Sequence, residues 1–270
     1  MNEAKMLKGK VALVTGSGRG LGYAIAHRLA ELGADVCLHD RSIDAPAEFG
    51  EFANLTSAAL SVASLGVRSF AVHGDISDEQ TVTRMVQVAE EALGPISILV
   101  NCAGGDIAAA GGKPNPNDGL GIKIEDVRAL LDRNLIGTML MCKAVVPSMI
   151  ARHLGSVVNI ASSAAHYGTT PEVAYASIKA AIVHYTRCLA LETRSQGVRV
   201  NAVSPGAIKT GRFLATRVTD PVKMEEGYDL NRYANPIEIA NGVAFLASDM
   251  ASFVHGQVLR IDGGVTLFAG

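Results

Sequence analysis

Short apolar stretches alternate with longer helical ones along almost the whole chain, and this alternation constrains the fold more than any other feature. The apolar stretches predict strands at residues 10–15, 35–39, 68–73, 98–101, 156–160, 198–203 and 257–261. Helices are predicted at residues 20–32, 79–93, 125–153, 173–196 and 236–246, and Pro147 predicts a bend in the third of them. Strands that alternate with helices favour an α/β fold, here a doubly wound parallel sheet of about seven strands with helices on both faces.

The length and composition of the chain fit a single domain. The chain has 270 residues, no internal linker and 49% hydrophobic residues, so we expect one domain over residues 1–270 with a large core. The net charge of −2 and the scattered basic residues give no indication of a nucleic-acid partner. The N-terminus lacks an apolar signal-peptide core, and no apolar run reaches the length that crosses a bilayer. No membrane partner is therefore expected.

The four cysteines show no metal-binding pattern. Cys37, Cys102, Cys142 and Cys188 have neither CxxC nor zinc spacing. Cys37 and Cys102 lie in apolar strand-like contexts, where buried free thiols are ordinary. We therefore expect a reducing, cytoplasmic location and no metal site.

Two irregular segments interrupt the alternation, at residues 104–121 and 210–235. The first is rich in Gly, Pro and Asn and directly follows a predicted strand, at the edge where open α/β sheets bind ligands. Long irregular segments beside a site are often lids, although surface decoration is also common. We expect these two to be lids.

The first predicted strand runs into the glycine-rich sequence TGSGRGLG at residues 15–22. Glycines permit positive φ and close approach to a diphosphate, which the N-terminus of the following helix attracts. The strict G-x-G-x-x-G pattern fails because position 21 is Leu, and the spacing T-G-x-x-x-G-x-G holds instead. A tight β–α connection is the alternative reading. Asp40, twenty residues after Gly20 at the end of the second strand, favours a nucleotide because its carboxylate can accept both ribose hydroxyls of an adenosine.

The charges near this turn bear on the choice between NAD and NADP. The carboxylate of Asp40 repels a 2′-phosphate, whereas Arg19 and Arg41 could bind one. We favour NAD, because Asp40 would have to move aside for NADP while the arginines can face solvent. At the next strand ends, Asp75 and Ile76 are placed for an adenine edge, and the small residues after Asn101 leave room for a cofactor. Ordinary turn chemistry is the alternative at both places.

Tyr175 and Lys179 stand four residues apart, a spacing that puts both side chains on one face of a helix. A tyrosine alone holds its proton up to a pH of about 10. A nearby fixed cation favours the phenolate and lowers that pKa, which turns the phenol into an acid/base group. Taken alone, such a pair is more often a solvated helix face.

The motifs together make the chain resemble the short-chain dehydrogenase/reductase family. The matching elements, in order, are TGSGRGLG at 15–22, Asp40, Asp75, NCAG at 101–104, Asn134, Ser162, YASIK at 175–179 and SPGAIKT at 204–210. The resemblance covers nearly the whole chain and implies a single Rossmann-type catalytic domain. The family often has Asn where this chain has Cys102, a small residue that fits the same place. The resemblance also implies a homotetramer or homodimer.

The resemblance implies a role for each matching residue. Tyr175 is expected to be the acid/base, Lys179 to lower its pKa and hold the nicotinamide ribose, and Ser162 to hydrogen-bond the substrate oxygen. Asn134 is expected to keep a bend in its helix and to support a water linked to Lys179. Thr210 is expected to bind the nicotinamide carboxamide. The cofactor contacts implied are Gly16, Ser17, Arg19, Gly20, Leu21, Gly22, Asp40, Asp75, Ile76, Asn101, Ala103, Gly104, Tyr175, Lys179, Pro205, Gly206, Ile208 and Thr210.

The implied reaction is hydride transfer between NAD(P) and a secondary alcohol or ketone. Lys209, Arg212 and Arg217 in the second irregular segment favour an anionic or polyhydroxylated small molecule, although a solvated loop face is an equal alternative. We expect NAD-dependent dehydrogenation of a sugar, polyol or similar hydroxy compound. The alternatives are an NADPH-dependent 3-oxoacyl-(acyl-carrier-protein) reductase, for which no basic docking patch is evident, and a catalytically silent nucleotide-binding protein, which would not need Ser162, Tyr175 and Lys179.

Overall fold

The core of the computed structural model, which describes residues 6–267, is one parallel sheet of seven strands in the order β3-β2-β1-β4-β5-β6-β7. Every neighbouring pair of strands is parallel. The strands are β1 (Val11–Val14), β2 (Asp35–Asp40), β3 (Ser69–His73), β4 (Ile98–Asn101), β5 (Gly155–Ile160), β6 (Val198–Pro205) and β7 (Val258–Ile261). All seven predicted strands are confirmed, and so is the doubly wound α/β fold.

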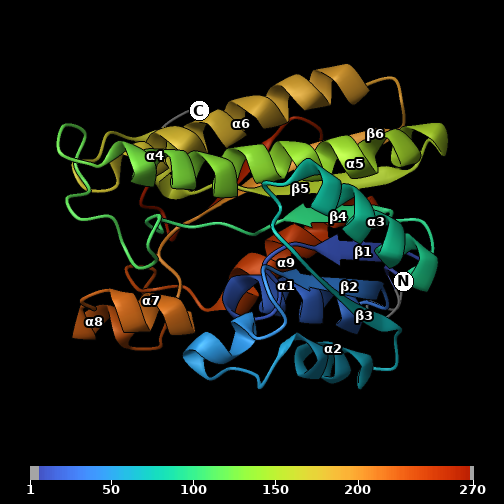
Figure 1. The fold of residues 1–270 in the computed structure, drawn as a ribbon, viewed down its shortest axis with the longest axis horizontal. Coiled ribbons are helices and arrows are strands. Elements are labelled where there is room, and N and C mark those ends of the chain that lie inside the picture. Colours follow the sequence, from blue (N-terminus) through green and yellow to red (C-terminus); the bar gives the residue numbers. More distant parts are fainter. Residues whose placement is uncertain (1–5, 268–270) are drawn as a thin grey trace.

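Helices cover both faces of the sheet (Figure 1). One face packs against α1 (Gly20–Glu31), α2 (Leu55–Ala63) and α9 (Pro236–Ala247), and the other against α3 (Glu79–Leu93), α5 (Gly137–Ala151) and α6 (Val173–Thr193). In β1, Ala12 and Val14 join the first of these cores, whereas Val11 and Leu13 join the second. Both sides of the strand are thus buried, which explains its unbroken apolar sequence.

The expectation of one domain over residues 1–270 stays a prediction, and residues 1–5 and 268–270 lie outside the described part of the chain. The sequence prediction missed α2. This helix begins at a capping box in which Asn54 accepts from the backbone of Ser57 and the Ser57 hydroxyl accepts in return. Its sequence, LTSAALSVA, carries small residues instead of a strong apolar stripe.

The long helix predicted at 125–153 is interrupted, although not at Pro147. It consists of α4 (Ile124–Leu131), a π-helical turn η3 (Asp132–Ile136) and α5, which continues through Pro147. At the interruption, the amide of Asn134 donates to the carbonyl of Leu130 at 2.9 Å. A side chain that donates a hydrogen bond to a backbone carbonyl of its own helix disturbs the regular pattern of backbone hydrogen bonds there. Such π-helical turns are frequent at functional sites.

One helix is long and apolar enough to cross a bilayer by length and composition alone, a feature that the search for long apolar runs in the sequence did not single out. The continuous helix Ile124–Ala151 has 28 residues and a mean hydropathy of 1.4 in its most apolar window, of which 44% is buried. Several apolar residues of this helix face the core of the domain. Met141, Cys142 and Val145 are buried in the core against the sheet, as the core helix of a folded domain requires.

The two irregular segments lie at the carboxyl edge of the sheet. Residues 104–121 contain no helix or strand, and residues 210–235 contain only α7 (Gly211–Thr216) and α8 (Pro221–Met224). Figure 1 shows α7 and α8 apart from the two main helical layers. Shorter turns are η2 (Ala45–Phe49), η4 (Ser163–His166) and η5 (Asp249–Ala251).

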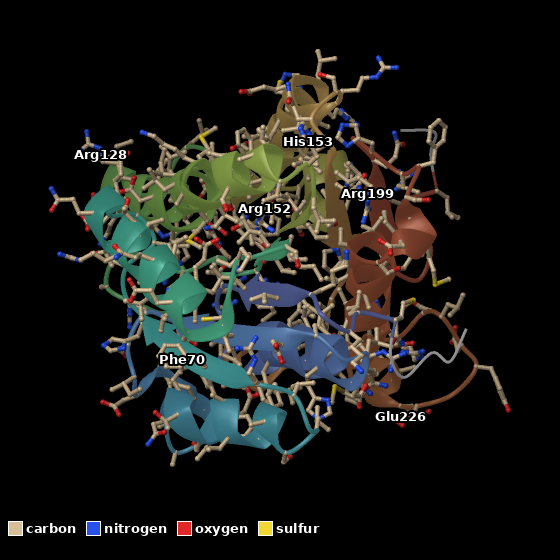
Figure 2. The ribbon with its side chains drawn as sticks, turned by 90° about the vertical axis from the view of Figure 1, so that its right-hand side faces the viewer. Phe70, Arg128, Arg152, His153, Arg199 and Glu226 are labelled. Carbon is tan, nitrogen blue, oxygen red and sulfur yellow. The ribbon has the colours of Figure 1, made fainter. Side chains whose placement is uncertain are left out.

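At the opposite, amino edge of the sheet, two arginines labelled in Figure 2 bind backbone carbonyls. Arg152 donates to the carbonyl of Ile96 at 2.6 Å, and Arg199 donates to the carbonyl of Leu246 at 2.7 Å. A cavity of about 760 Å³ lies at this edge, and none of the predicted site residues lines it. The predicted site residues therefore lie away from this cavity, and those that follow the strands lie at the carboxyl edge.

Candidate active site

The glycine turn between β1 and α1 is joined to the end of β4. The hydroxyl of Thr15 accepts hydrogen bonds from the amides of Cys102 and Ala103, both at 3.0 Å. Gly16 has a φ of 64°, and a Cβ there would lie 2.7 Å from the Cα of Ala103. Only glycine permits this approach, so the first glycine of the motif is required by packing between two strand ends.

Ser17 and His39 hold the turn from inside. The Ser17 hydroxyl donates to the carbonyl of Val14 and accepts from the amide of His39, so this buried side chain supports the turn from inside. The buried imidazole of His39 accepts from the amide of Gly16 through Nδ1, and its Nε2 bonds the carbonyl of Gly74. Burial lowers the pKa of His39, which is consistent with a neutral ring that links the turn to β3.

The start of α1 holds an anionic oxygen. The amide of Gly20 donates to a carboxylate oxygen of Glu51 at 2.7 Å, and the guanidinium of Arg19 pairs with Glu48 at 2.7 Å and stacks on the ring of Phe49. A helix N-terminus favours such an anion. Sequence reasoning missed Glu48 and Glu51, because nothing in their spacing relates them to the glycine turn.

At the ends of β2 and β3, Asp40 lies against the glycine turn, whereas the contacts seen for Asp75 and Ile76 are with other parts of the chain. A Cβ on Gly18 would lie 2.7 Å from a carboxylate oxygen of Asp40, so this carboxylate lies against the motif. The Asp75 carboxylate accepts from the amide and hydroxyl of Ser77, which is the turn chemistry named as the alternative. Ile76 is buried and packs against Gly137 of α5.

At the end of β4, Asn134 clamps the chain. Its side chain accepts from the amide of Gly105 at 2.9 Å and donates to the carbonyl of Gly105 at 3.1 Å. A Cβ on Gly104 would lie 2.4 Å from its oxygen. The side chain of Asn101 points into the core, where it donates to Asn159 at 2.9 Å. Asn134 therefore connects the π turn to the start of the first irregular segment.

Ser162, Tyr175 and Lys179 come together at the carboxyl ends of β5 and β6. Ser162 follows β5 and forms a hydrogen bond with the phenol of Tyr175. The buried ammonium of Lys179 donates to the carbonyl of Ile160 at 2.8 Å and lies 5.6 Å from the centre of the Tyr175 ring. The spacing prediction that Tyr175 and Lys179 share a helix face is confirmed by this contact.

The pKa of Tyr175 does not follow the prediction. Burial raises the pKa of Tyr175 to about 12, and the hydrogen bond from Ser162 opposes that rise. Burial also lowers the pKa of Lys179 to about 8. The expected lowering by Lys179 is absent in the protein alone, because desolvation dominates and the ammonium lies beside the ring and bonds a backbone carbonyl.

The segment after β6 crosses back to the glycine turn. Pro205 ends β6, Gly206 follows it, and Ile208 bridges to Ala234. Thr210 caps α7 by accepting from the amide of Phe213 at 3.2 Å, and a Cβ on Gly20 would lie 3.6 Å from Thr210. Arg212 of α7 donates to the carbonyl of Gly104 through both terminal nitrogens at 3.3 Å. The segments that follow β1, β4 and β6 thus lie next to one another at one edge of the sheet.

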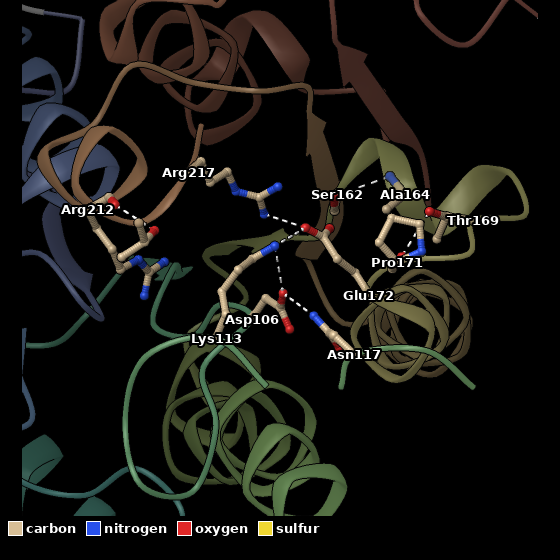
Figure 3. Close-up of polar contacts among 11 residues, drawn as sticks. Asp106, Lys113, Asn117, Ser162, Ala164, Thr169, Pro171, Glu172, Arg212 and Arg217 are labelled. Atoms are coloured by element: carbon tan, nitrogen blue, oxygen red, sulfur yellow. Dashed lines mark hydrogen bonds and ion pairs between the residues drawn. The ribbon is translucent and has the colours of Figure 1, made fainter. Parts of the chain in front are cut away.

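A polar network not predicted from sequence joins the first irregular segment to the start of α6 (Figure 3). Lys113 pairs with Glu172 at 2.8 Å and Asp106 at 3.4 Å, and Arg217 pairs with Glu172 at 2.6 Å. Asn117 donates to Asp106 at 2.8 Å. Glu172 has a φ of 69°, a conformation that costs free energy in a non-glycine residue. The network fixes both segments close to Tyr175.

Comparison with known proteins identifies the family. A family model described as enoyl-(acyl carrier protein) reductase matches residues 16–266. Cyclohexanol dehydrogenase of Rhodococcus sp. (strain TK6) is 33% identical over 98% of this chain and 99% of its own length. The 3-oxoacyl-(acyl-carrier-protein) reductase of Aquifex aeolicus (strain VF5) is 34% identical over 96% of this chain and 98% of its own. The chain belongs to the short-chain dehydrogenase/reductase family.

A solved member of the short-chain dehydrogenase/reductase family shares the fold. It is a 7α-hydroxysteroid dehydrogenase complexed with NADH and 7-oxo glycochenodeoxycholic acid, 33% identical, with a TM-score of 0.82 over 98% of this chain and 97% of that chain. The protein is accordingly an oxidoreductase of CH–OH groups that uses a nicotinamide cofactor. The glycine turn fits the diphosphate of such a cofactor, since the amide of Gly20 already bonds an anionic oxygen.

Proposed function

We propose that the protein is an NAD-dependent dehydrogenase of a small secondary alcohol, a sugar, polyol or similar hydroxy compound. The convergence of Ser162, Tyr175 and Lys179 beside the glycine turn carries this proposal. The cofactor supplies the hydride acceptor or donor. Tyr175 takes or gives the proton of the substrate oxygen, and Ser162 hydrogen-bonds that oxygen and holds it in place. Lys179 grips the nicotinamide ribose.

The other residues predicted for the site have supporting roles in this proposal. Asn134 holds the end of β4 through its two bonds to Gly105 and supports a water linked to Lys179. Thr210 keeps its hydroxyl hydrogen available for the nicotinamide carboxamide, because in the observed contact it only accepts. Gly206 and Ile208 border the nicotinamide.

The choice of NAD rests on charge. Asp40 lies against Gly18, where an adenosine ribose would reach it. Arg19 is already paired with Glu48, so it is less available for a 2′-phosphate. Arg41 is exposed and supports NADP as the alternative cofactor. The similarity to the Aquifex aeolicus reductase makes an NADPH-dependent 3-oxoacyl-(acyl-carrier-protein) reductase the second candidate function.

The proposal includes a homotetramer or homodimer in the cytoplasm. The family resemblance supports the oligomer. The four cysteines are free, which agrees with a reducing compartment. Sedimentation analysis of the purified chain measures its oligomeric state directly.

The test is an assay of initial rates with NAD and NADP over sugars, polyols, simple secondary alcohols, a hydroxysteroid and 3-oxoacyl thioesters. We expect turnover of small hydroxy compounds with NAD. In Tyr175→Phe, kcat/KM should fall by at least about 10²-fold because the proton-transfer group is lost, while NADH binding stays within twofold. Tyr185→Phe, on the same helix, is the matched control and should stay active. Turnover confined to acyl thioesters with NADPH would favour the second candidate, and full activity of Tyr175→Phe would refute the mechanism.

A further inference from the structure

The three cations of the second irregular segment differ in how the structure uses them. Lys209 pairs with Glu226 at 3.2 Å, and Arg217 pairs with Glu172 at 2.6 Å. Within residues 6–267, Arg212 has no carboxylate in ion-pair contact, and its side-chain hydrogen bonds are the two to the carbonyl of Gly104 at 3.3 Å. Only Arg212 therefore keeps an uncompensated charge among these three.

Arg212 also has the position to meet a substrate. Its guanidinium lies over Gly104 and Gly105, since a Cβ on Gly105 would be 2.4 Å from its Nη2. It is close enough to Tyr175 and Lys179 to lower the pKa of both groups. The cation thus lies near the phenol, at the carboxyl edge of the sheet.

The neighbouring charged residues neutralise one another. Two cations, Lys113 and Arg217, meet two carboxylates, Asp106 and Glu172, in one connected network (Figure 3). A substrate anion would have to break these pairs to use their cations. Arg212 would lose only two long bonds to a carbonyl.

Burial of a cation without a partner costs free energy. A guanidinium presents several donors in a planar fork that matches the oxygens of a carboxylate, sulfonate or phosphate. We propose that Arg212 recognises an anionic group on the substrate whose CH–OH group lies at Tyr175, so that the preferred substrates are hydroxy acids or sugar acids and not their neutral counterparts. This inference rests on the proposed function and narrows its substrate class.

The experiment compares matched alcohols with the whole enzyme. The panel holds 3-hydroxybutanoate, its methyl ester and 2-butanol, the sulfonate and phosphate analogues 2-hydroxypropane-1-sulfonate and 2-hydroxypropyl phosphate, and a sugar acid with its neutral sugar. We expect kcat/KM of the wild type to favour at least one anion over its neutral match by about ten- to hundredfold, the range of a charge-assisted hydrogen bond. The three anionic head groups distinguish carboxylate, sulfonate and phosphate.

The variant Arg212→Gln should remove this preference. Its kcat/KM for the anion should fall by about ten- to hundredfold, with little change for the neutral match. Arg212→Lys should retain part of the preference, because the charge stays while the fork is lost. Lys209→Gln, a paired cation three residues away on the same segment, is the control and should keep it. Circular dichroism and thermal unfolding check that each variant folds.

Titration with NADH separates substrate recognition from cofactor binding. We expect the Kd of NADH to change less than twofold in Arg212→Gln. A rise in that Kd equal to the fall in kcat/KM would assign Arg212 to the cofactor and overturn the inference. Equal rates for anions and neutral matches in the wild type would also overturn it while leaving the proposed function intact. A wild type that oxidises no alcohol with either cofactor would overturn both.

Discussion

At the scale of single residues, burial controls the protonation of the two groups proposed to be catalytic, Tyr175 and Lys179. The pKa of Tyr175 is raised to about 12, so the phenol holds its proton at neutral pH. The pKa of Lys179 is lowered to about 8, so its ammonium begins to lose its charge slightly above neutrality. The protein alone is thus prepared to donate a proton to a ketone, whereas alcohol oxidation needs the phenolate.

This state of Tyr175 predicts opposite pH dependences for the two directions. Below a pKa of about 12 the phenolate fraction rises tenfold per pH unit, so kcat/KM for alcohol oxidation should rise with a slope of up to one logarithmic unit per pH unit between about pH 6 and 8, where Lys179 still carries its charge. Ketone reduction uses the proton already present and should stay nearly level up to about pH 8, where Lys179 starts to deprotonate. Initial rates in both directions check this, and a level oxidation profile would contradict it.

At the scale of elements, the glycine turn before α1 contacts two segments that are distant in sequence, one at Ala103 and one at Glu51. The glycines were recognised from their spacing, and the contact of Gly16 with Ala103 explains why one of them must be glycine. Glu51 could not be recognised in the same way. Its carboxylate reaches Gly20 only because η2 folds over the end of the sheet, next to α7.

This contact predicts that Glu51 competes with the cofactor for the amide at the start of α1. Glu51→Gln should tighten NADH binding by about two- to tenfold, because removing a carboxylate from a helix N-terminus takes away an anion that occupies and repels the diphosphate. Fluorescence titration with NADH measures the effect. Glu31→Gln, at the other end of α1, is the control and should leave the Kd unchanged. Weaker binding by Glu51→Gln would show that Glu51 assists the cofactor.

At the scale of the whole molecule, the candidate site is assembled from segments far apart in sequence. The ends of β1, β4 and β6 meet through Thr15, Ala103 and Thr210. A ligand that bridges these ends stabilises the folded state, since it binds the folded chain and not the unfolded one.

The midpoint temperature of thermal unfolding, Tm, should therefore rise when the cofactor binds. At a concentration of about one hundred times its Kd, NAD should add about 2.7 kcal/mol to the free energy of unfolding, which corresponds to a rise in Tm of about 5–10 °C for a chain of this size. NADP at the same concentration should give a smaller rise because of Asp40, and Asp40→Ala should narrow the difference. An equal or larger rise with NADP in the wild type would contradict the assignment of NAD.

The sequence alone determined the layers of the fold, the place of the glycine turn and the pairing of Tyr175 with Lys179, because apolar periodicity and helical spacing are local properties. The tertiary structure decided what depends on distant segments meeting. It placed the Ser17 side chain inside the turn and paired Arg217 with Glu172 and Lys209 with Glu226. Among residues 6–267, it placed no carboxylate in ion-pair contact with Arg212. It also raised the pKa of Tyr175, because desolvation depends on everything that surrounds a side chain and not on its neighbours in sequence.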